Sequence, residues 1–230
     1  MSPLQLASLA LAFLGPVVLW AMHRRRPHPA LERNFASGIA ALLGAVFVAG
    51  LVQKFCEGNF TAQNALPMQL CDWALFAVVA ALLARSQTCF ELAYFWGLCG
   101  TVQALLTPAI ETDRAWWLQV GFFLDHAGIV AGVLFLLIVP KMRPRGLWRV
   151  VLWSEIYLAA ALIANALTGG NYGFLAHRPT QRTMLDLFSD TPWLHVAGIN
   201  GLALVFFAAI YLPWLIADLL RKSAAPTHPA

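Results

Sequence analysis

The stretch WWLQVGFFLDHAGIVAGVLFLLIV, residues 116–139, decides the fold class of this chain. A helix needs about 20 apolar residues to cross roughly 30 Å of hydrocarbon, and this stretch is long enough. Its ionisable side chains are those of Asp125 and His126, close to its middle. The stretch therefore predicts a transmembrane helix that carries two polar groups inside the membrane.

Similar apolar runs fill the rest of the chain. Hydrophobic residues make up 60% of the sequence and charged residues 11%, with a mean hydropathy of +0.69. A soluble domain carries roughly 25% charged residues, so lipid has to cover much of this surface. We predict an all-α, polytopic transmembrane helix bundle in one domain, 1–222, with a flexible tail, 223–230. The seven predicted spans are 4–22, 36–54, 69–85, 89–107, 116–139, 147–167 and 193–217.

The distribution of basic residues predicts the orientation. With the N-terminus outside, four Lys and Arg residues fall in outer segments, namely Lys54, Arg114, Arg178 and Arg182. Eleven fall in inner segments, namely Arg24, Arg25, Arg26, Arg33, Arg85, Lys141, Arg143, Arg145, Arg149, Arg221 and Lys222. The positive-inside rule then places the C-terminus in the cytoplasm. Basic residues clustered between apolar runs are typical of a membrane protein, so we expect no nucleic-acid partner.

The first apolar run, 4–22, precedes its basic residues, Arg24 to Arg26. A signal peptide has the opposite order, with its positive charges ahead of the apolar core. We therefore expect a retained first span.

Two outer connections differ from simple turns. Segment 55–68, FCEGNFTAQNALPM, is polar, and segment 168–192 is long and mixes polar with apolar residues. Long loops of mixed character are often functional. Surface connections of no further role are the alternative.

Cys71 opens the span at 69–85, next to Asp72. A thiol in the first turn of a helix lies near the positive end of the helix dipole, which favours the thiolate. Two other roles remain open at this point. Cys71 can be a small packed residue, or it can form a disulfide with Cys56 around the 55–70 loop.

His126 lies about 15 Å into its span, at 1.5 Å per residue. A neutral imidazole at that depth needs a hydrogen-bond partner. It is either a structural histidine satisfied by a neighbouring helix, or a general base, general acid or metal ligand. Asp125 is adjacent, and adjacent helical positions point apart, so we do not expect a simple pair.

No zinc-binding spacing or phosphate-binding glycine loop occurs, so we predict no metal and no cofactor.

Three strings together carry a family resemblance. They are LPMQLCDWALF (66–76), the pair Asp125-His126, and NALTGGNYGFLAHRPTQRTMLDLFSDTPWLH (165–195). These strings resemble the YwaF-like bacterial membrane proteins, which group with eukaryotic transmembrane protein 164, over roughly residues 35–217. The first matches the family's L-P-x-x-L-C entry to the third span, and the second supplies its histidine in the fifth span. The third string is the most specific, because these residues fall in register: Asn171, Tyr172, Leu175, Pro179, Leu185, Asp186, Pro192 and Trp193.

The chain departs from the family pattern at Gln69, where many relatives have His, and at Arg178, Thr183 and Leu194. The eukaryotic branch resembles cysteine-dependent phospholipid acyltransferases. It is also distantly similar to the androgen-induced-protein group of intramembrane hydrolases, which use Thr and His. The resemblance therefore implies Cys71 as nucleophile with a histidine base, membrane lipids as partners, and a bacterial inner membrane as the location.

The resulting hypothesis is acyl transfer or acyl-ester hydrolysis at a cavity that faces the outer leaflet. His126 would activate Cys71, and side chains nearby would orient it or stabilise an oxyanion, namely Asp72, Asp125, Asn165 and Asn171. Arg178 and Arg182 are placed to meet a lipid phosphate, or they belong to a solvated loop.

A rival hypothesis is a transporter or binding protein for a small molecule or a proton. Asp72, Asp125 and His126 would then form a relay that Glu155 extends toward the inner face. A structural role without any reaction is a third possibility.

The enzyme hypothesis has a geometric requirement, because an interfacial Cys71 would not reach a histidine in mid-membrane. Segment 55–70 must dip inward so that the third span begins deep, which is tolerated only inside protein or at a wet cavity.

Overall fold

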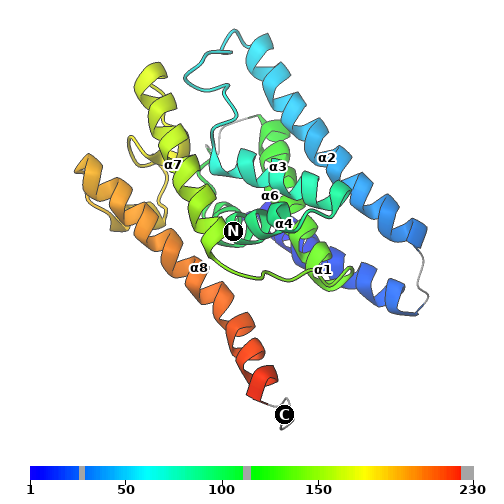
Figure 1. The fold of residues 1–230 in the computed structure, drawn as a ribbon. Coiled ribbons are helices and arrows are strands. Elements are labelled where there is room, and N and C mark those ends of the chain that lie inside the picture. The colour runs from blue at the N-terminus through cyan, green and yellow to red at the C-terminus, as the bar shows by residue number, and fades with distance from the viewer. Residues whose placement is uncertain (26–28, 111–114, 224–230) are drawn as a thin grey trace.

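The computed structural model describes residues 1–25, 29–110 and 115–223, and the regular secondary structure in these ranges is entirely helical, as predicted. Figure 1 shows the arrangement of the helices. In chain order they are α1 (Pro3–Arg25), α2 (Pro29–Cys56), α3 (Leu70–Ala84), α4 (Gln87–Trp96), the π-helix η1 (Gly97–Thr101), α5 (Val102–Leu106), α6 (Trp116–Ile138), α7 (Trp148–Thr168), the 3-10 helices η2 (Tyr172–Phe174) and η3 (Met184–Leu187), and α8 (Pro192–Ser223).

Each predicted span corresponds to a helix or helical run, but these differ in length. Within the described ranges, six are long and apolar enough to cross a membrane: α1, α2, the run Gln87–Leu106, α6, α7 and α8. α3 has 15 residues and reaches about 22 Å, short of the roughly 30 Å of a hydrocarbon core. Arg26 and Arg114, which entered the orientation count, and tail residues 224–230 lie outside the described residues.

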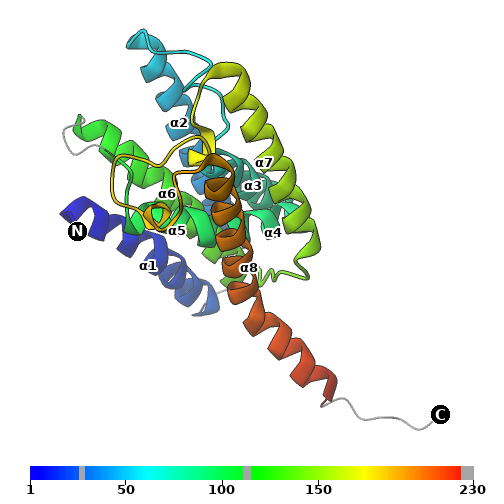
Figure 2. The same ribbon diagram turned by 90° about the vertical axis from the view of Figure 1, so that its left-hand side faces the viewer.

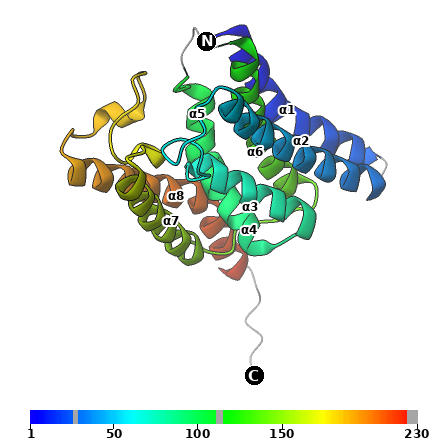
Figure 3. The ribbon, with the colours of Figure 1, turned by 90° about the horizontal axis from the view of Figure 1, so that it is seen from above.

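α6 is the central helix of the larger part of the bundle, where it packs against α1, α2 and α3 (Figure 3). Two of its glycines permit close contact. A Cβ atom on Gly128 would lie 2.9 Å from Leu43 of α2, and one on Gly132 would lie 2.8 Å from Val78 of α3. Small residues four positions apart let helix backbones approach closely in membranes. This spacing therefore fixes how close α6 comes to α2 and α3.

The fourth span is interrupted by the π-helical turn η1. A Cβ atom on Gly100 would lie 3.1 Å from Leu70, the first residue of α3, and one on Gly97 would lie 3.2 Å from Val133 of α6. π turns inside α-helices are frequent at functional sites. Here the turn lets the fourth span pack closely against the start of α3 and against α6.

α7 and α8 stand at one side of the bundle, and α3 and α4 lie between them and α1–α2 (Figures 1 and 3). Of the residues in α8, His195 and Phe207 are buried. The last part of α8 extends beyond the other helices (Figure 2), where Arg143 forms a two-bond ion pair with Asp218 at 2.7 and 3.0 Å. Much of the apolar surface of α8 is therefore available to lipid.

One end of the bundle, called here the basic end, gathers ten described basic residues: Arg24, Arg25, Arg33, Arg85, Lys141, Arg143, Arg145, Arg149, Arg221 and Lys222. At this end Arg85, which caps α3, pairs with Glu32 of α2 at 2.7 Å. Glu91 of α4 is 1% exposed and accepts a hydrogen bond from the backbone N–H of Arg145 at 2.9 Å. The first contact ties α3 to α2, and the second ties α4 to the connection between α6 and α7.

Candidate functional site

Cys71 and His126 lie at nearly the same depth in the bundle. Cys71 is in the first turn of α3, thirteen residues before its end at Ala84, and His126 is twelve residues before the end of α6 at Ile138. At 1.5 Å per residue, both are about 18–20 Å from the basic end. α3 is short because it begins inside the bundle, and its late start brings the thiol level with the imidazole.

The connection 57–69 has to descend into the bundle for α3 to begin at this depth. Backbone groups of such a segment need partners within the protein. The Tyr172 hydroxyl donates to the carbonyl of Ala62 at 2.8 Å and accepts from the N–H of Leu66 at 3.1 Å. Burial raises the pKa of Tyr172 above its usual value, so the phenol keeps the proton that it donates. The inward dip that the enzyme hypothesis requires is therefore present.

A second pair of contacts holds the last residues of this connection. The Tyr157 hydroxyl of α7 donates to the carbonyl of Met68 at 3.2 Å, and the Gln69 side-chain oxygen accepts from the N–H of Gly173 at 3.0 Å. Tyr157 also packs edge-on against Trp73 with ring centroids 5.3 Å apart. Sequence reasoning gave Tyr157 no role, because a single tyrosine in an apolar span is ordinarily a packing residue. Its contact with a distant loop carries no local sequence signal.

His126 is 6% exposed and is oriented by its own helix. Its Nδ1 atom lies 2.7 Å from the carbonyl oxygen of Phe122, and the two rings pack with centroids 4.1 Å apart. A carbonyl oxygen can only accept, so Nδ1 carries the proton in this hydrogen bond. In the neutral imidazole the other nitrogen, Nε2, then has the lone pair and can accept a proton.

Asp125 lies closer to His126 than their adjacent positions predicted. Its Oδ2 atom is 3.5 Å from Nδ1 of His126, so the expectation that these two side chains would not pair is wrong. The side chains bend into the same gap, although their Cα–Cβ bonds point apart. The other oxygen, Oδ1, is buried and has no hydrogen-bond partner within the described residues. An unpaired buried oxygen is unfavourable, so this is a place where a bound group can donate.

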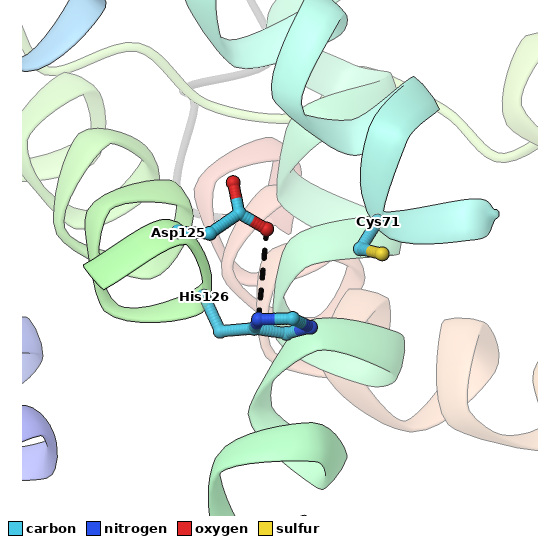
Figure 4. A group of neighbouring side chains, drawn as sticks. All are labelled: Cys71, Asp125 and His126. Atoms are coloured by element: carbon cyan, nitrogen blue, oxygen red, sulfur yellow. Dashed lines mark ion pairs between the residues drawn. The ribbon is translucent and has the colours of Figure 1, made fainter. Parts of the chain in front are cut away.

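Cys71, Asp125 and His126 form one cluster, in which one ligand atom of each lies within 4.8 Å of the others. Figure 4 shows the carboxylate and imidazole of α6 across a narrow gap from Cys71 of α3. Contacts between catalytic groups are often longer than a hydrogen bond before a substrate binds. The same three atoms are types that a zinc ion accepts. Sequence spacing predicted no metal, because these donors come from two distant segments.

Asn165 and Asn171 hold the outer loop. Both ends of the Asn165 amide bond the backbone of Tyr172, at 2.7 and 3.0 Å. Asn171 accepts from the N–H groups of Ala176 and His177 at 3.0 and 3.2 Å. Within the described residues, neither amide donates to the cluster. Asn165 positions Tyr172, which in turn holds the 57–69 connection, and Asn171 holds residues 176 and 177 of the loop.

The remaining predicted site residues are placed at the start of α3 and in the outer loop. Asp72 accepts from the N–H of Gln69 at 2.9 Å and so caps α3. Arg178 forms an ion pair with Asp190, and Arg182 is exposed to solvent. Of the two arginines, Arg182 is therefore the one without an ion pair within the described residues.

Cys71 is not consumed by a disulfide. All four cysteines are free thiols, with Cys56 exposed and Cys71 half-buried. The disulfide alternative is therefore not the arrangement in this structure, and the Cys71 thiol is available for chemistry.

The fold and the cluster define a polytopic α-helical membrane protein with a Cys–Asp–His group between two of its central helices. The chain belongs to the TMEM164 family, whose family model matches residues 1–211. The matched region contains the whole cluster and most of α8, and it confirms the resemblance drawn from the sequence. No match was found among curated proteins or among solved structures.

Proposed function

We propose that this protein is an intramembrane acyltransferase or acyl-ester hydrolase that acts on membrane lipids through Cys71 and His126. The observation that supports this most is the cluster, in which thiol, carboxylate and imidazole lie within 4.8 Å of one another. A nucleophile, its base and a third group that orients the base form the recurring arrangement of covalent catalysis. The free lone pair on Nε2 of His126 is consistent with the role of base.

The reaction has two displacement steps. His126 takes the proton of the Cys71 thiol, and the sulfur attacks the carbonyl carbon of a lipid ester. The new C–S bond forms as the ester C–O bond breaks, and the leaving oxygen takes the proton back from His126. The hydroxyl of a second lipid, or water, then loses its proton to His126 and attacks the thioester. The acyl group leaves on that oxygen, and the sulfur recovers its proton.

The start of α3 offers donors for the oxyanion that forms at each step. The first N–H groups of a helix have no partner inside the helix. That of Leu70 makes no hydrogen bond within the described residues, and that of Cys71 points to its own sulfur. Fixed donors next to the reacting carbonyl stabilise the developing negative charge. This assignment replaces Asn165 and Asn171, whose amides are used in the outer loop.

The 57–69 connection provides the route from the outer face. It contains exposed polar residues, including Asn59 and Thr61, and it ends beside Cys71. With seven spans and the basic end in the cytoplasm of a bacterial inner membrane, this route opens toward the outer leaflet. Arg182, which is exposed in the outer loop at this face, is the cation that would bind the lipid phosphate.

The transporter hypothesis requires polar groups on both sides of the cluster. Between Cys71 and the basic end, the buried residues of α3 are all apolar, and so are those of α6 after His126. Glu155, which was expected to extend a relay, is exposed on α7 and accepts from Asn200 at 3.0 Å. The apolar lining that α3 and α6 present between the cluster and the basic end favours an enzyme over a transport pathway.

The test uses the full chain purified in detergent and a 4-nitrophenyl ester of a medium-chain fatty acid. Release of nitrophenol measures turnover, and intact mass spectrometry measures acyl addition. We expect one acyl group on the wild type, removed by hydroxylamine, and none on Cys71→Ala. A fluorescent phospholipid then distinguishes transfer from hydrolysis by its products.

Cys56→Ala is the matched control, because Cys56 is the exposed thiol and any nonspecific acylation would be greatest there. Turnover that survives in Cys71→Ala and disappears in Cys56→Ala would overturn the proposal. Retention of the wild-type rate in His126→Gln would remove the histidine from the mechanism.

A further inference from the structure

A pocket of about 460 Å³ lies at the basic end, between the last turns of α1 and α6. Its lining residues are Trp20, His23, Arg24, Ile138, Val139 and Lys141. It is separate from the Cys–Asp–His cluster, which lies about 18–20 Å deeper along α6. A volume of this size is typical of sites for small ligands.

The charge of this pocket is unbalanced. Arg24 and Lys141 reach it from two different helix ends, and its described lining residues include no carboxylate. Within the described residues, neither cation forms an ion pair. Two other arginines of the basic end are neutralised, Arg85 by Glu32 and Arg143 by Asp218, each at 2.7 Å. The pocket therefore presents at least two positive charges without a counterion from the part of the chain that the structure describes.

Two features hold these cations toward the pocket. The Arg24 guanidinium lies 5.3 Å from the centre of the Trp20 ring, a cation–π contact one turn back along α1. Lys141 has a φ of 55°, and its turn is closed by the N–H of Met142, which donates to the carbonyl of Leu136 at 2.9 Å. His23 adds a third polar group, because its Nδ1 atom has no hydrogen-bond partner within the described residues.

The other side of the pocket is apolar and continues into the lipid-facing surface. Ile138 and Val139 line it, and Val17 and Val18 of α1 are 48% and 57% exposed one turn away. A free phosphate would use only the cationic side of this site. A phospholipid would use both sides, with its phosphate between the cations and its acyl chains along α1.

We propose that this pocket binds the phosphate headgroup of an anionic phospholipid from the leaflet at the basic end. Basic pockets between transmembrane helices are suited to such headgroups, and each Lys or Arg near an anionic lipid strengthens binding about 5-fold. Two cations converging on one phosphate therefore favour anionic over zwitterionic lipid by about 30-fold. The proposal does not depend on the reaction assigned to Cys71.

Native mass spectrometry of the full chain in detergent tests this site. The probes are phosphatidylglycerol and phosphatidylcholine with identical acyl chains, titrated separately. We expect one phosphatidylglycerol molecule to bind about 30-fold more tightly than phosphatidylcholine. Arg24→Gln combined with Lys141→Gln should remove that preference, whereas Arg24→Lys combined with Lys141→Arg should retain most of it.

The matched control is Arg221→Gln combined with Lys222→Gln, which removes two exposed cations from the same end outside the pocket. Equal loss in the control and the pocket variant would show general surface attraction and overturn the proposal. Inorganic phosphate provides a second arm, because displacement of the lipid by low millimolar phosphate would identify a free-anion site instead. A pocket variant that loses its monodisperse, wild-type unfolding profile is replaced by the Arg24→Gln single variant, for which about 5-fold weaker binding is expected.

Discussion

α6 and α8 are alike in sequence character and opposite in their surroundings. Their most apolar stretches have mean hydropathies of 2.0 and 2.1, yet 61% of that stretch is buried in α6 and 6% in α8. α6 carries the cluster and is enclosed by other helices, whereas α8 exposes most of its length. Hydropathy therefore predicts that a helix lies in the membrane, but it does not predict whether protein or lipid surrounds it.

The glycines of the two helices account for part of this difference. Gly128 and Gly132 of α6 meet side chains of α2 and α3, but a Cβ atom on Gly201 of α8 would meet nothing within 4 Å. Without a hydrophobic driving force between helices in lipid, close packing decides which helices associate. The proposed reaction needs side chains held in fixed positions, and the closely packed helix supplies two of the three in the cluster.

Replacement of the buried histidine in each helix should give the largest contrast. His126→Gln should lower the rate of ester hydrolysis at least 100-fold, because general bases contribute about 10²–10⁴ in rate. His195 of α8 is 3% exposed and contacts the carbonyl of Phe174 at 2.8 Å, so His195→Gln should change the rate only a few-fold. Nitrophenol release from the purified variants measures both.

Equal losses in the two histidine variants would break the comparison, because they would mean that burial of an imidazole matters and its position does not. Thermal unfolding of each variant provides the control for folding. His126→Gln should unfold within a few degrees of the wild type, because glutamine can still donate to the carbonyl of Phe122.

The glycine contrast concerns stability. Gly132→Ala places a methyl group 2.8 Å from Val78, so the Val78 side chain or the helix backbones must shift, with an expected loss of about 1–3 kcal/mol. Gly201→Ala adds the same methyl group in open space and should be neutral or slightly stabilising. Unfolding in sodium dodecyl sulfate titrations compares the two variants. A Gly201→Ala protein that is as unstable as Gly132→Ala would show that helix flexibility, and not packing against α3, explains the glycines.

The sequence was sufficient to predict the helices, and the family resemblance pointed to Cys71 and His126, which the structure brings into one cluster. Residues 116–139 predicted α6 closely, because a long apolar run with interfacial tryptophans has few alternatives. The relative depth of Cys71 and His126 was stated only as a requirement, since hydropathy does not report where a 15-residue helix begins along the membrane normal. That depth depends on Tyr172, which lies more than 100 residues from the loop that it holds.

The supporting residues were harder to predict, for a physical reason. Asn165 and Asn171 were expected beside the reacting carbonyl, because amides are suitable donors and lie near the outer span ends. Amides are equally suited to satisfy the backbone of a loop, and the structure uses both in this way. The type of residue gives its chemical capacity, but its partners depend on the path of the loop.

Two tyrosines that donate to a backbone carbonyl show a similar contrast, the buried Tyr172 and Tyr211 of α8, whose hydrogen bond is exposed. Tyr172→Phe leaves the carbonyl of Ala62 and the N–H of Leu66 without their partner, at an expected local loss of about 1–2 kcal/mol. Hydrogen exchange in residues 57–69 should then become about tenfold faster. Tyr211 of α8 donates to the carbonyl of Arg145 at 3.3 Å at an exposed position, so Tyr211→Phe should leave exchange unchanged. Unaltered exchange in Tyr172→Phe would mean that other contacts, such as that of Tyr157, suffice to hold the dip.

The smallest effect is expected at the end of α8, where the ion pair between Arg143 and Asp218 is more than 30% exposed on both sides. Exposed ion pairs contribute about 0.2–1 kcal/mol and weaken with salt. Asp218→Asn should therefore cost less than about 1 kcal/mol at low salt and close to nothing at 1 M salt. Trp214 also donates to the hydroxyl of Tyr94 at 3.0 Å, so α8 stays attached. Unfolding titrations at the two salt concentrations measure this difference. A large loss of stability that salt does not alter would show that α8 depends strongly on this ion pair. The two helices would then differ in the type of contact that holds them, glycine packing for α6 and an ion pair for α8, and not in how strongly they are held.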